Sequence, residues 1–289
     1  MPEHLLTELD RDSAARVRAA RAFIFDMDGT LVLGDKSSGG HKALPGAAEL
    51  LSGLRSRDIP FQIFTNGTAF VPAHYAASLR KAGLDVRDEE MMTPATAAAD
   101  YFVRRKMGRV RVLGCPGVSQ PLIDAGLDVI GPGEESDSVH AVLTGWYRDF
   151  TYPELERACH SIWEGANLFT CSHVPFFAAA GGRAIGSSYA INVMIRSLTN
   201  ARINIVGKPA RAAFDCALGR MGLKKSAARD VVVVGDDPAL EMRMAQGAGA
   251  LGIGVTTGLH DHDSFGAQAV RQRPHATLSG LAPILNAIG

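Results

Sequence analysis

The sequence has little cysteine, no excess charge of either sign and no long apolar run. Its four cysteines lie far apart and form no Cys-x-x-Cys pair, which argues against a zinc site and a disulfide framework. Thirty basic residues balance thirty acidic ones, so the field that would gather nucleic acid or an anionic membrane surface is absent overall. No stretch resembles a signal peptide or a membrane span. These absences predict a cytoplasmic protein with a small substrate and with no nucleic-acid or membrane partner.

What remains is the composition of an ordinary globular protein. The 289 residues, 46% of them hydrophobic, are enough for about two domains. Strand-like runs alternate with helical apolar spacing early in the chain, in the order Ala22–Phe25, Leu44–Arg57, Phe61–Phe64 and Pro72–Ala82. A Gly- and Ser-rich loop at 36–40 separates the first strand from the first helix. This β, α, β, α order predicts a parallel sheet.

The same alternation returns near the other end of the chain. Strands are predicted at Arg202–Val206, Val231–Val234 and Leu251–Val255, and helices at Ala210–Met221 and Ala239–Gln246. The stretch between the two halves alternates on its own, with strands at 109–113 and 139–143 and helices at 95–107 and 152–164. We therefore infer an α/β core domain in two pieces, 1–94 and 205–289, with a second α/β domain, 95–204, inserted into it.

A Gly-rich stretch between two of these elements matches the dinucleotide-binding pattern GxGxxG. It runs from Gly247 to Gly252. Dinucleotide binding needs this pattern between a strand and the helix that follows it, whereas here it follows a helix and enters a strand. We therefore interpret the stretch as a turn.

Polar side chains follow the predicted core strands where those strands end. They are Asp26 and Asp28 after the first strand, Thr65 and Asn66 after the second, Lys208 just beyond Val206, and Asp236 and Asp237 after the valine strand. In an open parallel sheet, ligand sites form at the carboxyl ends of the strands, where connecting loops meet. We therefore expect four loops to converge on one site.

These side chains supply the parts that phosphoryl transfer needs. Asp26, at the strand end, can accept the phosphoryl group as an acyl phosphate. Asp28 returns to the same face of an extended backbone, so it can protonate the leaving oxygen and later activate water. Thr65 and the main-chain N–H of Asn66 can donate to the phosphate, and Lys208 adds a compact positive charge. The set predicts a catalytic site for phosphate esters.

A carboxylate nucleophile and an anionic phosphate repel each other unless a divalent cation lies between them. Mg²⁺ prefers oxygen ligands in octahedral geometry. We expect the side chains of Asp26 and Asp236 to bind it, with the main-chain carbonyl of Asp28 as a further ligand. Asp237 and Glu241 can orient its water ligands, and both also suit the stabilisation of a helix N-terminus by negative charge.

Four motifs, in this order, resemble those of haloacid dehalogenase-like phosphatases. They are Asp26-Met27-Asp28-Gly29-Thr30-Leu31, Thr65-Asn66, Gly207-Lys208-Pro209 and Gly235-Asp236-Asp237. Finer detail resembles subfamily IIA, the group of NagD, 4-nitrophenylphosphatase and phosphoglycolate phosphatase, through Leu33-Gly34, Leu44-Pro45-Gly46-Ala47, Thr65-Asn66-Gly67-Thr68 and Val206-Gly207-Lys208-Pro209. The likeness extends over nearly the whole chain from Ala22 onward.

The resemblance implies a specific architecture and activity. It implies a Rossmannoid parallel-sheet core, a C2-type cap inserted between the second and third motifs, Mg²⁺, and an aspartyl-phosphate intermediate. The protein would then be a phosphoric monoester hydrolase that acts on a small phosphorylated metabolite. Dimers formed through the cap are common among such proteins, so a homodimer is one arrangement to expect.

The cap segment departs from the pattern of these relatives. They usually have Thr-Asn-x-Asp where this chain has Thr170-Cys171-Ser172-His173, and the Gly-rich segment that follows reads Gly186-Ser187-Ser188-Tyr189. His173 and Tyr189 are candidates for substrate contact, and they equally suit a local core or surface. The fourth motif ends in Glu241 where relatives commonly have Asp, a longer side chain that can keep the same outer hydrogen bonding.

Two functions of other classes fit parts of the pattern. A phosphorylated signalling module of the receiver type also combines an acceptor Asp, a Thr and a Lys on a parallel sheet. Its acceptor does not follow the first strand, however, and the Asp28 position and the large insertion disfavour it. A regulatory or binding protein on an inactive phosphatase scaffold is the third reading, and the altered cap motifs favour it.

Overall fold

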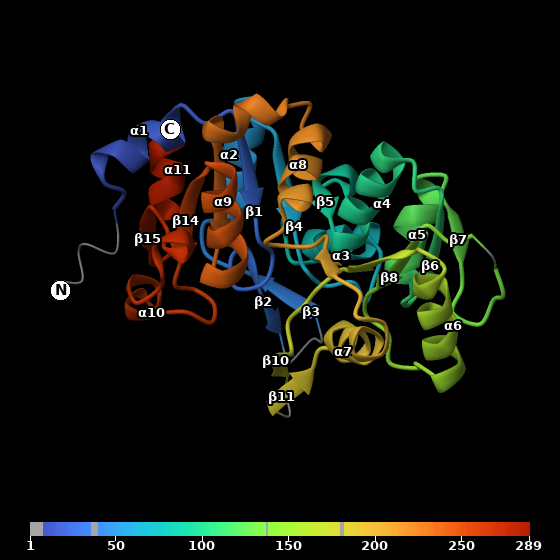
Figure 1. Ribbon diagram of the computed structural model, residues 1–289. Helices are drawn as coiled ribbons and strands as arrows, with labels where there is room; N and C mark the ends of the chain where they lie inside the picture. Colours follow the sequence, from blue (N-terminus) through green and yellow to red (C-terminus); the bar gives the residue numbers. More distant parts are fainter. Residues whose placement is uncertain (1–7, 36–39, 137, 180–181) are drawn as a thin grey trace. The chain divides into compact units, whose positions relative to one another are not determined.

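The computed structural model describes residues 8–35, 40–136, 138–179 and 182–289, and Figure 1 shows it as a ribbon. The chain folds into two compact units. The core unit comprises 1–65, 73–92 and 217–289, and the inserted unit comprises 66–72 and 93–216. Each unit is an α/β structure built on a parallel sheet.

The core unit contains a six-stranded sheet whose neighbouring strands are all parallel, in the order β15-β14-β13-β1-β4-β5. Its strands are β1 (Ala22–Phe25), β4 (Phe61–Phe64), β5 (Met91–Met92), β13 (Val231–Gly235), β14 (Leu251–Val255) and β15 (Ala276–Leu278). Every residue of β1, β4, β13 and β14 is buried. Central parallel strands are covered on both faces, which explains their nearly continuous apolar sequences.

Helices pack against this sheet and complete its apolar core. They are α1 (Arg11–Arg18), α2 (Ala47–Arg55), α3 (Pro72–Lys81), α9 (Arg243–Ala248), α10 (His262–Gly266) and α11 (Ala282–Ile288), with the short η2 (Asp88–Glu90), η3 (Lys225–Asp230), η4 (Pro238–Met242) and η5 (Val270–Gln272). Phe23 and Phe25 of β1 share one apolar cluster with Leu50 and Leu54 of α2. The buried rings of β1 thereby fix the strand that directly precedes Asp26.

A hairpin follows the first motif. Its strands, β2 (Val32–Asp35) and β3 (Gly40–Ala43), are antiparallel, and Gly34 pairs with His41. The predicted Gly- and Ser-rich loop at 36–40 lies outside the described residues except for Gly40. The hairpin was not predicted, because its strands are short and carry no alternating apolar pattern.

The inserted unit has three layers, with a five-stranded parallel sheet between two layers of helices. The strand order of this sheet is β12-β9-β8-β6-β7. Its strands are β6 (Arg109–Leu113), β7 (Asp128–Ile130), β8 (Ala141–Thr144), β9 (Asn167–Thr170) and β12 (Ile203–Ile205), and β10 (Phe176–Ala179) and β11 (Gly182–Ile185) form a hairpin. Its helices are α4 (Pro94–Arg105), α5 (Pro116–Asp124), α6 (Tyr152–Trp163) and α7 (Ser187–Thr199), and α8 (Arg211–Arg220) continues from it into the core unit. Consecutive strand residues belong to different apolar clusters. Val142 shares one with residues of α6 and α7, and Leu143 shares the other with residues of α4 and α5.

Several predicted elements are confirmed, and others are shorter. The strands at 22–25, 61–64, 109–113 and 251–255 occur with the predicted bounds. The helix predicted at 44–57 begins only at Ala47, because Gly46 adopts a left-handed conformation with φ of 81°. The helix predicted at 239–246 begins earlier, as the π-helical η4, before α9.

One expectation about the sheet is wrong. The strand before Lys208 is β12, and it pairs with β9 of the inserted unit's sheet, not with the sheet that contains β1. The four loops therefore do not leave a single sheet. Ile203–Ile205 is only three residues long and half-buried, so its apolar pattern does not reveal which sheet it joins.

The turn predicted between helix and strand is confirmed at Gly249. Gly249 ends α9 in a left-handed conformation, with φ of 80°, and the chain then enters β14. All four cysteines are free thiols. Within the described part of the chain, no helix is both long and apolar enough to cross a membrane.

Candidate active site

Three of the predicted site residues follow neighbouring strands of the core sheet. Asp26 follows β1, and its main-chain N–H donates to the Val234 carbonyl of β13 (2.9 Å). Because β13 and β4 flank β1 in parallel register, Asp236 follows the strand on one side of β1 and Thr65 follows the strand on the other. Asp26 and Asp236 are buried, with 8% and 6% of the residue surface exposed. Two buried carboxyl groups that follow neighbouring strands favour a bound cation.

The loop after β14 holds Asp236. The main-chain N–H of Leu259 donates to Asp236 Oδ2 (3.0 Å), and the Thr257 hydroxyl donates to the Gly29 carbonyl. A Cβ added at Gly29 or Gly258 would overlap the Asp236 carboxylate. The backbone of both glycines thus closes around one carboxylate oxygen. This loop was not predicted, although Thr256 to Gly258 directly follow a predicted strand, which is the signal that could have revealed it.

The residues that follow β1 and β13 fit Mg²⁺, which needs few protein ligands, better than a metal ion that is coordinated only by side chains. Among the described residues, no group of three or more His, Cys, Asp or Glu is placed to hold a metal. Mg²⁺ is usually bound through one or two carboxylates, with waters and substrate phosphate completing its octahedron. Asp26 and Asp236, both buried, provide two carboxylates of this kind.

Asp28 differs from these two carboxylates because its side chain is 56% exposed. Its Oδ1 lies 3.3 Å from Nε2 of His41 on β3. The other ring nitrogen of His41, Nδ1, lies 2.8 Å from the Ser78 hydroxyl on α3. The hydrogen bond with Asp28 raises the pKa of His41, against the smaller effect of burial. Sequence reasoning missed His41 and Ser78, because neither belongs to a recognisable motif.

Asp237 and Glu241 stabilise the start of the helix that follows β13. Asp237 Oδ1 accepts from the main-chain N–H groups of Ala239 (2.7 Å) and Leu240 (3.3 Å). Glu241 is buried, packs over Gly235 and accepts from the Asp237 N–H through Oε2 (3.1 Å). These contacts agree with the predicted role of both residues in stabilising a helix N-terminus. Their role in orienting metal-bound water stays a prediction.

The inserted unit contains the other two phosphate-binding candidates. Asn66 Oδ1 accepts from the Lys208 main-chain N–H (2.9 Å), and Asn66 Nδ2 donates to the Lys208 carbonyl (3.1 Å). Lys208 is only 2% exposed. The Asn66 side chain therefore fixes the backbone of Lys208, a role that the sequence did not reveal. That Asn66 and Lys208 meet the same phosphate as Asp26 stays a prediction.

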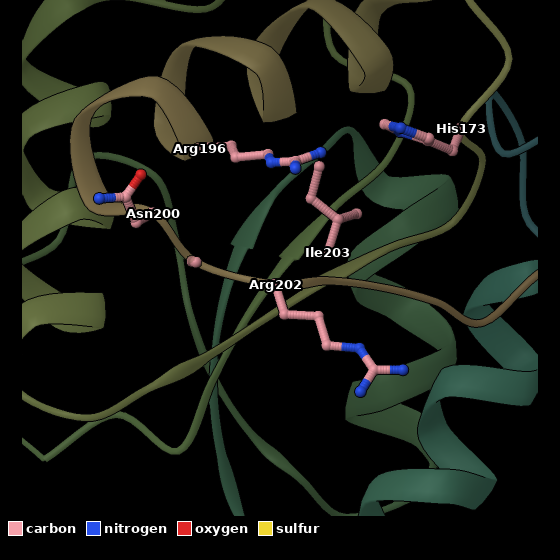
Figure 2. A pocket seen from close by; sticks show the side chains of 6 residues that line it. His173, Arg196, Asn200, Arg202 and Ile203 are labelled. Atoms are coloured by element: carbon pink, nitrogen blue, oxygen red, sulfur yellow. The ribbon is translucent and has the colours of Figure 1, made fainter.

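His173 and Tyr189 lie together in the inserted unit. Their ring centroids are 4.7 Å apart, and the rings are tilted by 40°. Burial lowers the pKa of His173, and the Arg196 charge adds to this effect. His173 lines a pocket of about 340 Å³ with Arg196, Asn200, Ala201, Arg202 and Ile203. In Figure 2, Arg196 extends toward His173, whereas Arg202 points away from both. Substrate contact at His173 or Tyr189 stays a prediction.

Two family profiles match the sequence. Residues 23–128 match the profile of haloacid dehalogenase-like hydrolases, and residues 205–283 match that of HAD-hydrolase-like proteins. Among curated proteins, an acid sugar phosphatase from Staphylococcus haemolyticus is 28% identical over 246 residues, which are 85% of this chain and 88% of that protein.

Solved structures share the whole fold. A 4-nitrophenylphosphatase from Thermotoga maritima is 24% identical, with a TM-score of 0.82 over 95% of this chain and 99% of that one. A glycerol phosphate phosphatase from Mycobacterium tuberculosis, solved in complex with magnesium, is 23% identical, with a TM-score of 0.79 over 93% and 77% of the two chains. The two profiles and the two parallel sheets together show that this chain belongs to the haloacid dehalogenase-like hydrolases and has the fold of 4-nitrophenylphosphatase and NagD.

Proposed function

We propose that the protein is a Mg²⁺-dependent phosphatase that hydrolyses a small phosphorylated metabolite through an aspartyl-phosphate on Asp26. The observation that carries this proposal is the pair of buried carboxylates, Asp26 and Asp236, at the ends of neighbouring strands. Such a pair favours a divalent cation, and a cation beside a strand-end carboxylate is what phosphoryl transfer to Asp26 requires.

The proposed reaction has two steps. Asp26, Asp236 and the Asp28 carbonyl would hold Mg²⁺, which would supply the positive charge that lets one anion approach another. An Asp26 carboxylate oxygen bonds to phosphorus while the ester P–O bond breaks, and the leaving oxygen takes a proton from Asp28. Asp28 then takes a proton from water, whose oxygen attacks phosphorus. Inorganic phosphate leaves, and Asp26 is restored.

Other residues would bind and neutralise the phosphate. Thr65 and the Asn66 N–H are proposed to donate to its oxygens, and Lys208 to add positive charge. Asp237 and Glu241 are proposed to orient metal-bound waters, while His173 and Tyr189 would contact the leaving group. The core domain would comprise 1–94 and 205–289, with the C2 cap at 95–204.

The relatives support a phosphomonoester substrate. One curated relative is named an acid sugar phosphatase, and two structural neighbours are named for 4-nitrophenyl phosphate and glycerol phosphate hydrolysis. We propose a sugar or polyol phosphate of similar size. A homodimer through the cap and a cytoplasmic location remain predictions of the same proposal.

Phosphate release from p-nitrophenyl phosphate, with and without Mg²⁺, tests the function. The wild type should turn over with Mg²⁺ and lose activity in EDTA. Asp26→Asn should lower kcat by at least about 10³-fold, because it removes the nucleophile. Asp263→Asn, at an exposed aspartate of α10, is the matched control. An undiminished rate in Asp26→Asn would refute the nucleophile, and binding of phosphate esters without turnover would favour the regulatory alternative.

A further inference from the structure

Asp28, His41 and Ser78 form a connected chain of polar contacts in the core unit. Asp28 Oδ1 contacts His41 Nε2 (3.3 Å), and His41 Nδ1 contacts the Ser78 hydroxyl (2.8 Å). The three residues come from the loop after β1, from the hairpin strand β3 and from α3. Three separate pieces of the fold thus meet at one imidazole ring.

A neutral imidazole satisfies both contacts. If the Ser78 hydroxyl donates to Nδ1, the ring proton sits on Nε2 and points at the Asp28 carboxylate. The partner of one histidine nitrogen decides which tautomer the ring adopts. A protonated ring instead donates from both nitrogens, to Asp28 and to the Ser78 hydroxyl, so in either form the contact with Ser78 is compatible with an N–H group that faces Asp28.

Asp28 needs such a partner more than the other carboxylates of the site do. Asp26 and Asp236 are held by burial, whereas more than half of the Asp28 side chain is exposed. An exposed carboxylate can move among staggered rotamers. A general acid, however, must stay within hydrogen-bond reach of the oxygen that it protonates. The His41 side chain is only 20% exposed, so it offers Asp28 a fixed contact.

We propose that His41 is a positioning residue that holds the Asp28 carboxyl group in the orientation needed for proton transfer, with Ser78 fixing the ring of His41. The proposal rests on the phosphatase function above and extends it to two residues outside the four motifs. Its distinctive consequence concerns the leaving group. In the first step, esters whose leaving oxygen must be protonated depend on a well-placed Asp28, whereas esters with a good leaving group depend on it much less.

A series of ring-substituted phenyl phosphates, from p-nitrophenyl to unsubstituted phenyl phosphate, measures this dependence with little change in substrate shape. His41→Ala should lower kcat/KM for phenyl phosphate about tenfold, but for p-nitrophenyl phosphate by less than about twofold, because positioned proton transfer contributes mainly when the leaving oxygen is basic. Ser78→Ala should act in the same direction, but less. His41→Gln, whose amide can still donate to Asp28, should restore most of the loss.

Matched controls are His160→Ala, at an exposed histidine of α6, and Ser52→Ala, at an exposed serine of α2. Both should keep the wild-type leaving-group dependence. An equal fall for every ester, or no fall, in a folded His41→Ala protein would overturn the positioning role while leaving the phosphatase function intact. A wild type that hydrolyses none of these esters with Mg²⁺ would overturn both proposals.

Discussion

Asn66 uses both polar atoms of its side chain to bind the main chain of Lys208. Its Oδ1 accepts from the Lys208 N–H and its Nδ2 donates to the Lys208 carbonyl, at 2.9 and 3.1 Å. Residues 142 positions apart in the sequence are thereby joined through one amide. This link holds the main chain of Lys208 in place, and the side chain that carries the ammonium group extends from it.

Replacing Asn66 with alanine should therefore weaken both stability and phosphate binding. Two main-chain groups of Lys208 would lose their partner, and each such loss costs about 1–3 kcal/mol where water cannot replace it. We expect a lower free energy of unfolding in urea and a higher inhibition constant for inorganic phosphate. Asn286→Ala, at an exposed asparagine of α11, should change neither quantity. Unchanged phosphate inhibition in Asn66→Ala would contradict the positioning of Lys208 by Asn66.

Gly258 is expected to control Mg²⁺ activation. A Cβ at this position would overlap Asp236 Oδ2, so Gly258→Ala must displace the carboxylate that Leu259 now holds. Disturbing the groups around metal ligands commonly costs about 10–100-fold in metal affinity. We expect the Mg²⁺ concentration for half-maximal activity to rise about tenfold, near the lower end of that range. Gly280→Ala, where a Cβ meets open space, is the control.

Titration of activity with Mg²⁺ at saturating p-nitrophenyl phosphate distinguishes this effect from general damage. A lower kcat at an unchanged Mg²⁺ requirement would argue against a role for Gly258 in holding the metal ligand. The same titration on the Gly280→Ala protein should overlay that of the wild type.

The central strands and the motif residues could be predicted because their signals are local. Ala22–Phe25 and Leu251–Val255 are short apolar runs with polar residues at their ends, and burial on both faces produces that pattern directly. Asp26, Thr65 and Asp236 could be placed at one edge from strand order alone. No knowledge of side-chain contacts was needed for these three.

The parts that sequence reasoning missed depend on pairing between distant segments. The sheet that Ile203–Ile205 joins is decided by its contact with β9, and three half-buried residues do not specify it. His41 reaches Asp28 only because β2 and β3 pair as antiparallel strands. Leu259 reaches Asp236 only because two glycines allow close backbone approach. Such contacts are products of tertiary structure.

The stability of the core unit should also depend on pH through His275. This residue precedes β15, and its Nδ1 accepts from the Gly252 main-chain N–H of β14 (3.0 Å). His275 is exposed as a residue, but partial desolvation of its ring, and then the charge of Arg16, lower the pKa of His275. A nitrogen that accepts a hydrogen bond cannot also hold a proton, so protonation would break this contact.

The sign of the effect follows from the lowered pKa. Below about pH 6.5, the ordinary value for histidine, the unfolded chain binds this proton more readily than the folded chain does, so stability falls as the pH falls toward the folded value. His275→Asn keeps an acceptor but does not titrate. The unfolding free energy of the wild type, measured in urea with EDTA between pH 7.5 and 5, should therefore fall more steeply than that of His275→Asn. His160→Asn, at an exposed site, should follow the wild type. Parallel curves for the wild type and His275→Asn would contradict a contribution of His275 to the pH dependence of stability in this range.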